Sequence, residues 1–232
     1  MNSIEPDKKV IQESLCDLMS PLNESERKLL MDTMTWRSYN RGELIYREGD
    51  IPRQLFCLIT GKVKIYKDGV GRSQIMRVLK PVEYFGYRAA FSQQAFITAA
   101  AALESSFIVK FPLNIIEQLI LTNTRLGWFF VQQLAMALGR SDERTVTLTQ
   151  KHLRARLAES IFYLRERYGV ESDGITLSSR LSREDMANLS SMTTNNAIRT
   201  LSLFTQEGLL QIEGRCIRII DEDGLRRVAE IG

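Results

Sequence analysis

The chain has 232 residues, of which 44% are hydrophobic and 25% charged, so it is long and apolar enough to fold as one or two globular domains. Its formal net charge of +3 permits a nucleic-acid partner without requiring one. Three well-separated cysteines and the single histidine, His152, indicate no disulfide framework, metal site, cofactor or conventional enzyme. The longest apolar run is far shorter than the roughly 20 residues that span a bilayer, and the charged first residues do not resemble a secretory signal, so we expect a cytoplasmic protein with no membrane partner.

The first predicted element is a short helix that begins after Asn23. Glu26 follows three residues later, so the two side chains can cap the first turn reciprocally. After this helix come short β-prone runs separated by turn residues such as glycine, aspartate and proline. Many short strands joined by tight turns are typical of an antiparallel barrel or double-sheet roll. The runs lie at residues 43–46, 55–59, 62–66, 74–79 and 107–111.

After Pro112 the pattern becomes helical, and an apolar seam with heptad spacing marks one long helix. We expect this seam to join two copies of the chain, while the alternative is a helix that lies only on its own roll. Polar residues at the far end weaken the seam and would let two helices shift register. The seam residues are Val131, Leu134, Leu138, Ser141, Thr145 and Leu148.

Residues 147–150 interrupt the seam and indicate a hinge before a second domain. A helix is predicted over residues 152–168. A shorter helix follows a cap at Ser182, and after a four-residue link a second helix runs over 194–207. The last segment, with turn residues at 213–214, is a β-hairpin. Two short helices joined by a tight turn and followed by a hairpin form a winged helix-turn-helix, although the same shape also serves as a protein-binding module.

The second short helix carries the side chains expected to read DNA. Thr194, Asn195 and Arg199 share the face opposite its predicted buried side. Because arginine pairs with guanine and asparagine with adenine, we expect a half-site that contains both bases. Other residues at helix N-termini and at the hairpin tip are expected to contact phosphates without reading sequence. They are Ser182, Arg183, Thr193, Asn196, Gly214 and Arg215.

Together these motifs resemble the CRP/FNR (cyclic-AMP receptor / fumarate-nitrate-reduction regulator) family over nearly the whole chain. The resemblance implies an α+β protein with an N-terminal antiparallel β-roll of jelly-roll type, a long dimerisation helix and a C-terminal winged helix-turn-helix. It implies a homodimeric, sequence-specific transcription regulator with double-stranded DNA and RNA polymerase as partners. We therefore expect a β-roll effector domain over residues 1–149, with the dimerisation helix at about 114–148, and a DNA-binding domain over 150–232. The motifs are Gly42 with Glu43, Glu48-Gly49-Asp50, residues 58–66, Phe85-Gly86, the long helix and the winged helix-turn-helix.

The residues that bind cyclic nucleotide in the family are replaced in this chain. The family's glutamate after the glycine that corresponds to Gly86 is Tyr87 here, and its arginine ten residues later is Ile97. Thr98 keeps the hydroxyl that usually follows that arginine. Burying a phosphate or a ribose hydroxyl without its partner costs about 2–5 kcal/mol each. We therefore expect no cyclic-AMP binding in the family's manner, and the effector ligand is unassigned.

Two interpretations of the altered pocket follow. Arg88 either supplies a displaced charge for another anion, or it faces solvent while Tyr87, Phe96 and Ile97 fill the pocket. An iron-sulfur sensor is not indicated because Cys16 stands alone near the N-terminus, and a haem sensor or a cupin-type enzyme would have a single histidine at its disposal. The main alternative function is a constitutive DNA-binding regulator without a small-molecule effector, controlled by its abundance or by a protein partner. The altered pocket comprises Gly86, Tyr87, Arg88, Ile97, Thr98 and Ser141.

The DNA-reading helix also departs from the family pattern. Where many members present Ser-Arg-Glu-Thr, this chain has Thr-Thr-Asn-Asn at residues 193–196, so only Arg199 carries over directly. We expect a half-site with fewer specified G·C pairs than is common in the family. Ser191 occupies the turn position that usually holds glycine, where a positive φ costs a residue with a side chain on the order of 1 kcal/mol.

Overall fold

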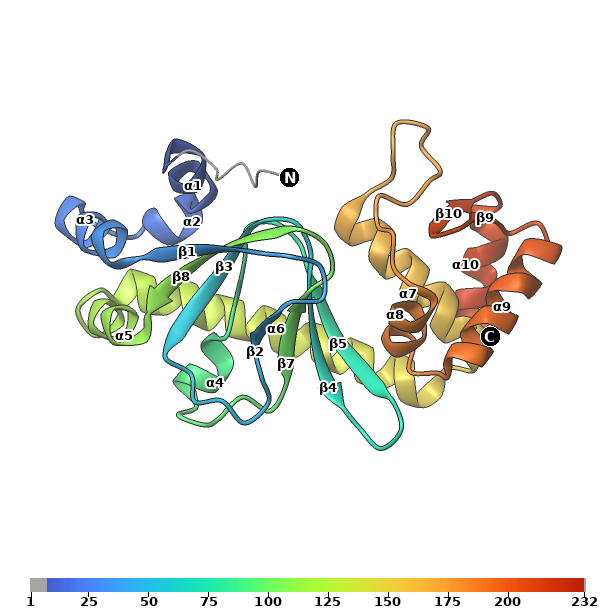
Figure 1. Cartoon of the computed structure of the whole chain (residues 1–232), viewed down its shortest axis with the longest axis horizontal. Coiled ribbons are helices and arrows are strands. Elements are labelled where there is room, and N and C mark those ends of the chain that lie inside the picture. The colour runs from blue at the N-terminus through green and yellow to red at the C-terminus, as the bar shows by residue number, and fades with distance from the viewer. Residues whose placement is uncertain (1–7, 232) are drawn as a thin grey trace. The chain divides into compact units, whose positions relative to one another are not determined.

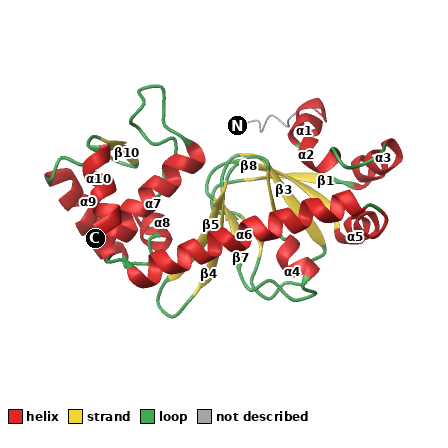
Figure 2. Cartoon of the chain, turned by 180° about the vertical axis from the view of Figure 1, so that it is seen from behind, coloured by secondary structure: helices red, strands yellow, loops and turns green. Residues whose placement is uncertain are grey.

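The computed structural model describes residues 8–231, and its contacts divide the chain into two compact units (Figure 1). The first unit comprises Met1–Lys67 and Arg77–Gly139, and the second comprises Asp68–Met76 and Arg140–Gly232. Helix α6 (Thr124–Gln150) contributes to both units and is continuous along its length (Figure 2). It begins later than the helix predicted at about 114–148, because α5 (Leu113–Thr122) is a separate helix before it. The residues predicted as a hinge, 147–150, form the last turn of α6 instead. Over the part of the chain that is described, no helix is long and apolar enough to cross a membrane.

The first unit is built around two four-stranded antiparallel sheets, which confirms the predicted roll. The strand order is β1-β8-β3-β6 in one sheet and β2-β7-β4-β5 in the other. Each predicted β-run forms a strand, and three further strands, β1, β6 and β7, complete the sheets. The strands are β1 (Thr35–Tyr39), β2 (Leu44–Tyr46), β3 (Gln54–Thr60), β4 (Val63–Asp68), β5 (Ser73–Leu79), β6 (Glu83–Phe85), β7 (Ala99–Ala102) and β8 (Ser106–Pro112).

Strand β3 lies between the two apolar clusters of the first unit. Because successive side chains on a strand point to opposite faces, Phe56 and Leu58 enter the cluster between the sheets, which we call the inner cluster. Leu55 and Cys57 enter the cluster on the other face of the same sheet, the outer cluster. Both faces are therefore buried, which explains why β3 is almost uninterruptedly apolar.

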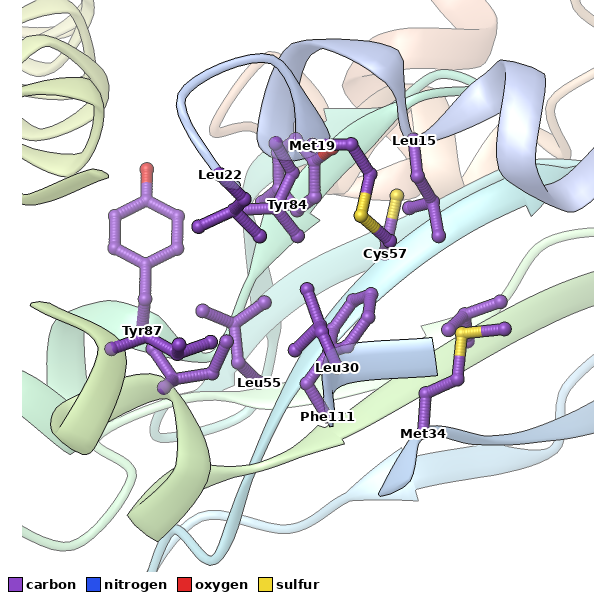
Figure 3. Packing of buried hydrophobic residues seen from close by; sticks show 14 of the residues in the cluster. Leu15, Met19, Leu22, Leu30, Met34, Leu55, Cys57, Tyr84, Tyr87 and Phe111 are labelled. Atoms are coloured by element: carbon purple, nitrogen blue, oxygen red, sulfur yellow. The ribbon is translucent and has the colours of Figure 1, made fainter. Parts of the chain in front are cut away.

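Helices cover the outer cluster. They are α1 (Lys8–Ser14), α2 (Cys16–Met19), α3 (Glu24–Thr33), α5 (Leu113–Thr122) and the first part of α6. Figure 3 shows Met19 and Leu30 from these helices packed against side chains of the sheet. At the start of α3, Glu26 N donates to Asn23 Oδ1 and Asn23 N donates to Glu26 Oε2, both at 2.9 Å. The reciprocal cap predicted from the sequence is confirmed.

The second unit contains the predicted helix-turn-helix and hairpin. The short helices begin and end within one residue of their predicted positions, and the hairpin strands pair in antiparallel register. A C-terminal helix that the sequence did not predict packs against the first helix of the unit. The elements are α7 (Leu153–Tyr168), α8 (Arg183–Leu189), α9 (Thr194–Gln206), β9 (Leu210–Glu213), β10 (Cys216–Ile219) and α10 (Glu222–Ile231).

Candidate nucleic-acid interface

Helices α8 and α9 pack closely because small residues lie in their buried faces. Ala187 of α8 and Ala197 of α9 are completely inaccessible to solvent. On α9, Leu201 and Phe204 extend the same buried face one and two turns further. The periodicity of these residues fixes which side of α9 turns away from the core.

Both helices have a side-chain cap at the N-terminus. Ser182 accepts from Asp185 N at 3.0 Å, and its hydroxyl donates to Asp185 Oδ2 at 2.7 Å. Thr193 accepts from Asn196 N at 3.3 Å. These caps satisfy amide groups that the helix itself leaves without acceptors, and they fix the direction in which each helix starts.

The link between the two helices includes one strained residue. Ser191 has a φ of +54°, so the serine adopts the left-handed conformation at the position that usually holds glycine in the family. Met192 N donates to Ala187 O at 3.0 Å, and the Met192 side chain is buried. The turn is thus held in place on both sides of Ser191.

The side of α9 that faces away from the core carries the predicted reading residues. Asn195 and Arg199 are exposed, and Thr194 is half-buried in the opening turn. Ile198 lies on the same face and is 45% exposed, a residue that the sequence interpretation did not single out. Its signal was present in the sequence, since Ile198 is apolar but out of phase with the buried residues of the helix. The exposed face therefore offers hydrogen-bonding groups together with one apolar contact.

The hairpin forms the wing. Strands β9 and β10 pair from Glu213 with Cys216 to Leu210 with Ile219, which leaves Gly214 and Arg215 as a two-residue turn. Gly214 has a φ of +58°, the conformation that tight hairpins require. The Arg183 Nη2 atom donates to Gly214 O at 2.7 Å, so the wing tip lies against the N-terminal end of α8. The structure thereby brings two groups of predicted phosphate contacts together.

In the first unit, the inner cluster contains five aromatic rings, four of which pack against one another. Tyr46 stacks on Phe96 with ring centroids 3.8 Å apart, and Phe56 stacks on Phe85 at 5.0 Å. Tyr46 also lies 5.8 Å from Phe56, which joins the two pairs. The rings therefore occupy the space between the sheets next to Gly86.

One interpretation of the sequence places Tyr87, Phe96 and Ile97 inside the altered pocket, but in the structure these residues lie in different places. Gly86, with a φ of +86°, caps helix α4 (Tyr87–Phe91), and a Cβ at this position would lie 2.8 Å from the ring of Phe56. Phe96 belongs to the inner cluster, as expected. Tyr87 instead belongs to the outer cluster (Figure 3), where its ring lies 6.0 Å from that of Phe130, and Ile97 is 64% exposed.

The hydroxyl of Tyr46 marks the polar edge of the inner cluster. Burial raises the pKa of Tyr46 to about 12, while a hydrogen bond with Thr98 and the positive charges of Arg77 and Arg88 oppose this rise. Arg88 is exposed. The charge of Arg77 is already paired, since its Nη2 atom lies 4.0 Å from Glu83 Oε2.

Helix α6 has one buried face and one exposed apolar face. Leu126 and Phe130 are buried in the outer cluster. The seam residues Val131 and Leu138 are 49% and 63% exposed, and Trp128, which the sequence interpretation did not include, is 62% exposed. Leu134 is also exposed, Leu148 is half-buried, and the Thr145 hydroxyl donates to Ser141 O within the helix.

Comparison with known protein families decides what this arrangement is. The cyclic nucleotide-binding domain model matches residues 36–123, and the Crp-like helix-turn-helix domain model matches residues 155–228. The chain belongs to the CRP/FNR family of transcription regulators. Its C-terminal unit is the family's DNA-binding helix-turn-helix, and the related proteins are regulators rather than enzymes.

Members of the CRP/FNR family from several bacteria resemble the chain over most of its length. Electron transport regulator A of Shewanella oneidensis is 28% identical over 215 residues, covering 90% of this chain and 84% of that protein. A CRP-like cAMP-activated global transcriptional regulator of Mycobacterium tuberculosis is 23% identical over 193 residues, covering 82% of this chain and 86% of that protein. The similarity therefore extends over both units of the chain.

Solved structures support the same fold. FixK2 from Bradyrhizobium japonicum superposes with a TM-score of 0.75 at 22% identity, covering 84% of this chain and 96% of that one. The c-di-GMP responsive global regulator CLP of Xanthomonas campestris superposes with a TM-score of 0.72 at 18% identity, covering 86% of this chain and 100% of that one.

Across residues 8–231, no group of three His, Cys, Asp or Glu side chains is arranged to hold a metal ion.

Proposed function

We propose that this regulator acts as a homodimer that binds a two-part DNA site in a sequence-specific manner. The observation that carries the proposal is the exposed face of α9, where Ile198 and Arg199 lie one helical turn after Asn195. In helix-turn-helix proteins this part of the second helix enters the major groove. Asparagine and arginine there offer bidentate hydrogen bonds to adenine and guanine.

The exposed apolar face of α6 supports the dimer. Trp128, Val131 and Leu138 recur at intervals of three and seven residues, so they form one stripe on the helix. Large apolar side chains on such a stripe are typical of an interface, and tryptophan is seldom left exposed. Two copies joined along α6 would place their α9 helices in major grooves about one helical turn, roughly 34 Å, apart.

We further propose that the regulator does not bind cyclic AMP in the family's manner. The four-ring cluster supports this, because it occupies the space between the sheets beside Gly86. Tyr87 and Ile97 also supply neither a carboxylate for a ribose nor a cation for a phosphate. The combined loss of roughly 4 kcal/mol or more corresponds to about a thousandfold in affinity.

The effector itself is left open between two candidates. The exposed Arg88 favours an anionic ligand at the edge of the rings, whereas Arg77 already lies 4.0 Å from the Glu83 carboxylate. The filled inner cluster favours the other candidate, a constitutively competent dimer controlled by its abundance or by a protein partner. As a transcription regulator it would act in the cytoplasm together with RNA polymerase. The boundary between its effector and DNA-binding domains would lie after residue 149, in the last turn of α6.

Selection of duplexes from a random pool, followed by fluorescence anisotropy with the selected duplex, tests the proposal. We expect a two-part site, binding by a dimer, and an affinity that 1 mM cyclic AMP leaves unchanged. Isothermal titration calorimetry with cyclic AMP is the control, and micromolar binding there contradicts the effector proposal. Recovery of random sequences alone contradicts the proposed specificity.

A further inference from the structure

The side chain of Arg183 binds the turn of the wing. Its Nη2 atom donates to Gly214 O at 2.7 Å, and its Nη1 atom is buried without a hydrogen-bond partner among the described residues. Arg183 is the first residue of α8, directly after the cap at Ser182. The bond therefore ties a hairpin turn to a rigid point of the helix-turn-helix.

The turn that receives this bond is short and exposed. Gly214 and Arg215 form the whole connection between β9 and β10, and both are exposed. A guanidinium that donates to a carbonyl makes a charge-assisted hydrogen bond, which is stronger and more directional than a neutral one. The direction of the Gly214 carbonyl fixes the plane of the following peptide, and hence where Arg215 begins.

Apart from Arg215, the charged side chains of the wing, Glu213 and Arg218, are paired with each other. Arg218 Nη1 donates to Glu213 Oε1 at 3.0 Å, and Gln211 Nε2 donates to the same oxygen at 3.0 Å. These bonds occupy the Arg218 charge and reduce the repulsion between Glu213 and a DNA phosphate. Arg215 is the exposed cation at the tip.

We propose that Arg183 is a positioning residue for DNA binding, which holds the wing tip so that Arg215 meets a backbone phosphate. This role replaces the direct phosphate contact that its place at a helix N-terminus suggests. The inference rests on the proposed DNA binding by this unit. It concerns affinity for any duplex, since phosphate contacts carry no sequence information.

A double-mutant cycle on duplex affinity tests the role. The variants are Arg183→Met, Arg215→Ala and both together, with Arg227→Met on α10 as a control that removes the same charge outside the predicted interface. We expect each single variant to weaken binding by about tenfold and to lower the log–log salt slope by about 0.9, the value for one phosphate. The double variant should be no weaker than the weaker single variant, because both changes remove the same contact.

Independent effects would overturn the inference. If the two losses multiply and the salt slope falls twice, Arg183 binds its own phosphate. If Arg183→Met leaves affinity and slope unchanged, it does not position the wing. Melting temperatures of all variants identify losses that come from unfolding, and Arg183→Ala replaces Arg183→Met if that variant does not fold.

Hydrogen exchange in the free protein separates this inference from the proposed function. Arg183→Met should speed exchange of the amides at residues 213–216, whereas Arg227→Met should leave them unchanged. Unchanged exchange in Arg183→Met overturns the positioning role. If the unmodified chain binds no duplex, the proposed function fails, and the exchange measurement still shows whether Arg183 holds the wing.

Discussion

Ile198 shows how one side chain can add a kind of recognition that hydrogen-bonding residues lack. It lies on the exposed face of α9 between Asn195 and Arg199, so it would approach the same stretch of the major groove. The only apolar group that a base presents there is the methyl group of thymine. We therefore expect thymine at one position of the half-site.

Replacing that thymine by deoxyuridine removes the methyl group and nothing else. The expected loss is about 1 kcal/mol, or about fivefold in affinity, because one buried methyl group is lost. Ile198→Ala should bind the thymine and uracil duplexes equally well. Ile231→Ala, which shortens an exposed isoleucine at the end of α10, should keep the fivefold difference. A selected half-site with no uracil-sensitive position contradicts this role.

Ser191 offers a second prediction at the scale of one residue. Its φ of +54° is unfavourable for a residue with a Cβ, whereas glycine adopts it freely. Ser191→Gly should therefore raise the free energy of unfolding by about 0.5–1 kcal/mol, after allowing for the greater entropy of glycine in the unfolded chain. Urea denaturation measures the change. A decrease in stability would show that the serine side chain makes a stabilising contact that exceeds the strain.

At the scale of elements, the sequence predicted the helices and strands whose ends are marked by capping or turn residues. The helix after Asn23 has a reciprocal cap, and the winged helix-turn-helix has caps, a turn and a hairpin, so their limits follow from local chemistry. Strand β7 escaped prediction because it consists of four alanines, which have low β-propensity. Pairing with β2 and β4 makes it a strand, and such long-range pairing leaves no local signal.

The cap of α8 can be tested as an element. Ser182→Ala removes the acceptor for Asp185 N, so we expect a loss of about 1 kcal/mol in the free energy of unfolding. Ser182→Thr keeps a hydroxyl that can accept from Asp185 N and donate to the Asp185 carboxylate, so it should retain most of the stability. Chemical denaturation followed by circular dichroism compares the two. Equal losses for both variants would contradict a stabilising role of the Ser182 hydroxyl.

At the scale of the molecule, the exposed face of α6 predicts the oligomeric state. Leu138→Glu places a charge in the apolar stripe, so it should shift the dimer to monomer and weaken binding to a two-part duplex by at least about tenfold. Leu121→Glu changes an exposed leucine at the end of α5, outside the stripe, and should leave the dimer intact. Light scattering coupled to size exclusion gives the mass. A dimer that persists in Leu138→Glu contradicts the seam.

The altered pocket could be predicted from the sequence only in part. The missing glutamate and arginine were evident at Tyr87 and Ile97, but the direction in which each side chain points was not. Tyr87 turns to the outer cluster because it packs with the rings of α6, a contact between distant segments. Trp128 and Ile198 lie outside the predicted sets because helical periodicity identifies buried faces, and an apolar residue out of phase with a buried face carries no sign of its role.

The stacked rings between the two sheets have a consequence for how this regulator can be controlled. A receptor switches when a ligand stabilises one of its states. On the proposed function, the stacked rings take the place of a ligand inside the roll, so the input arrives from outside it, at its rim or on its covering helices. The β-roll would then serve as a rigid spacer between the surface that receives a signal and helix α9, which reads DNA.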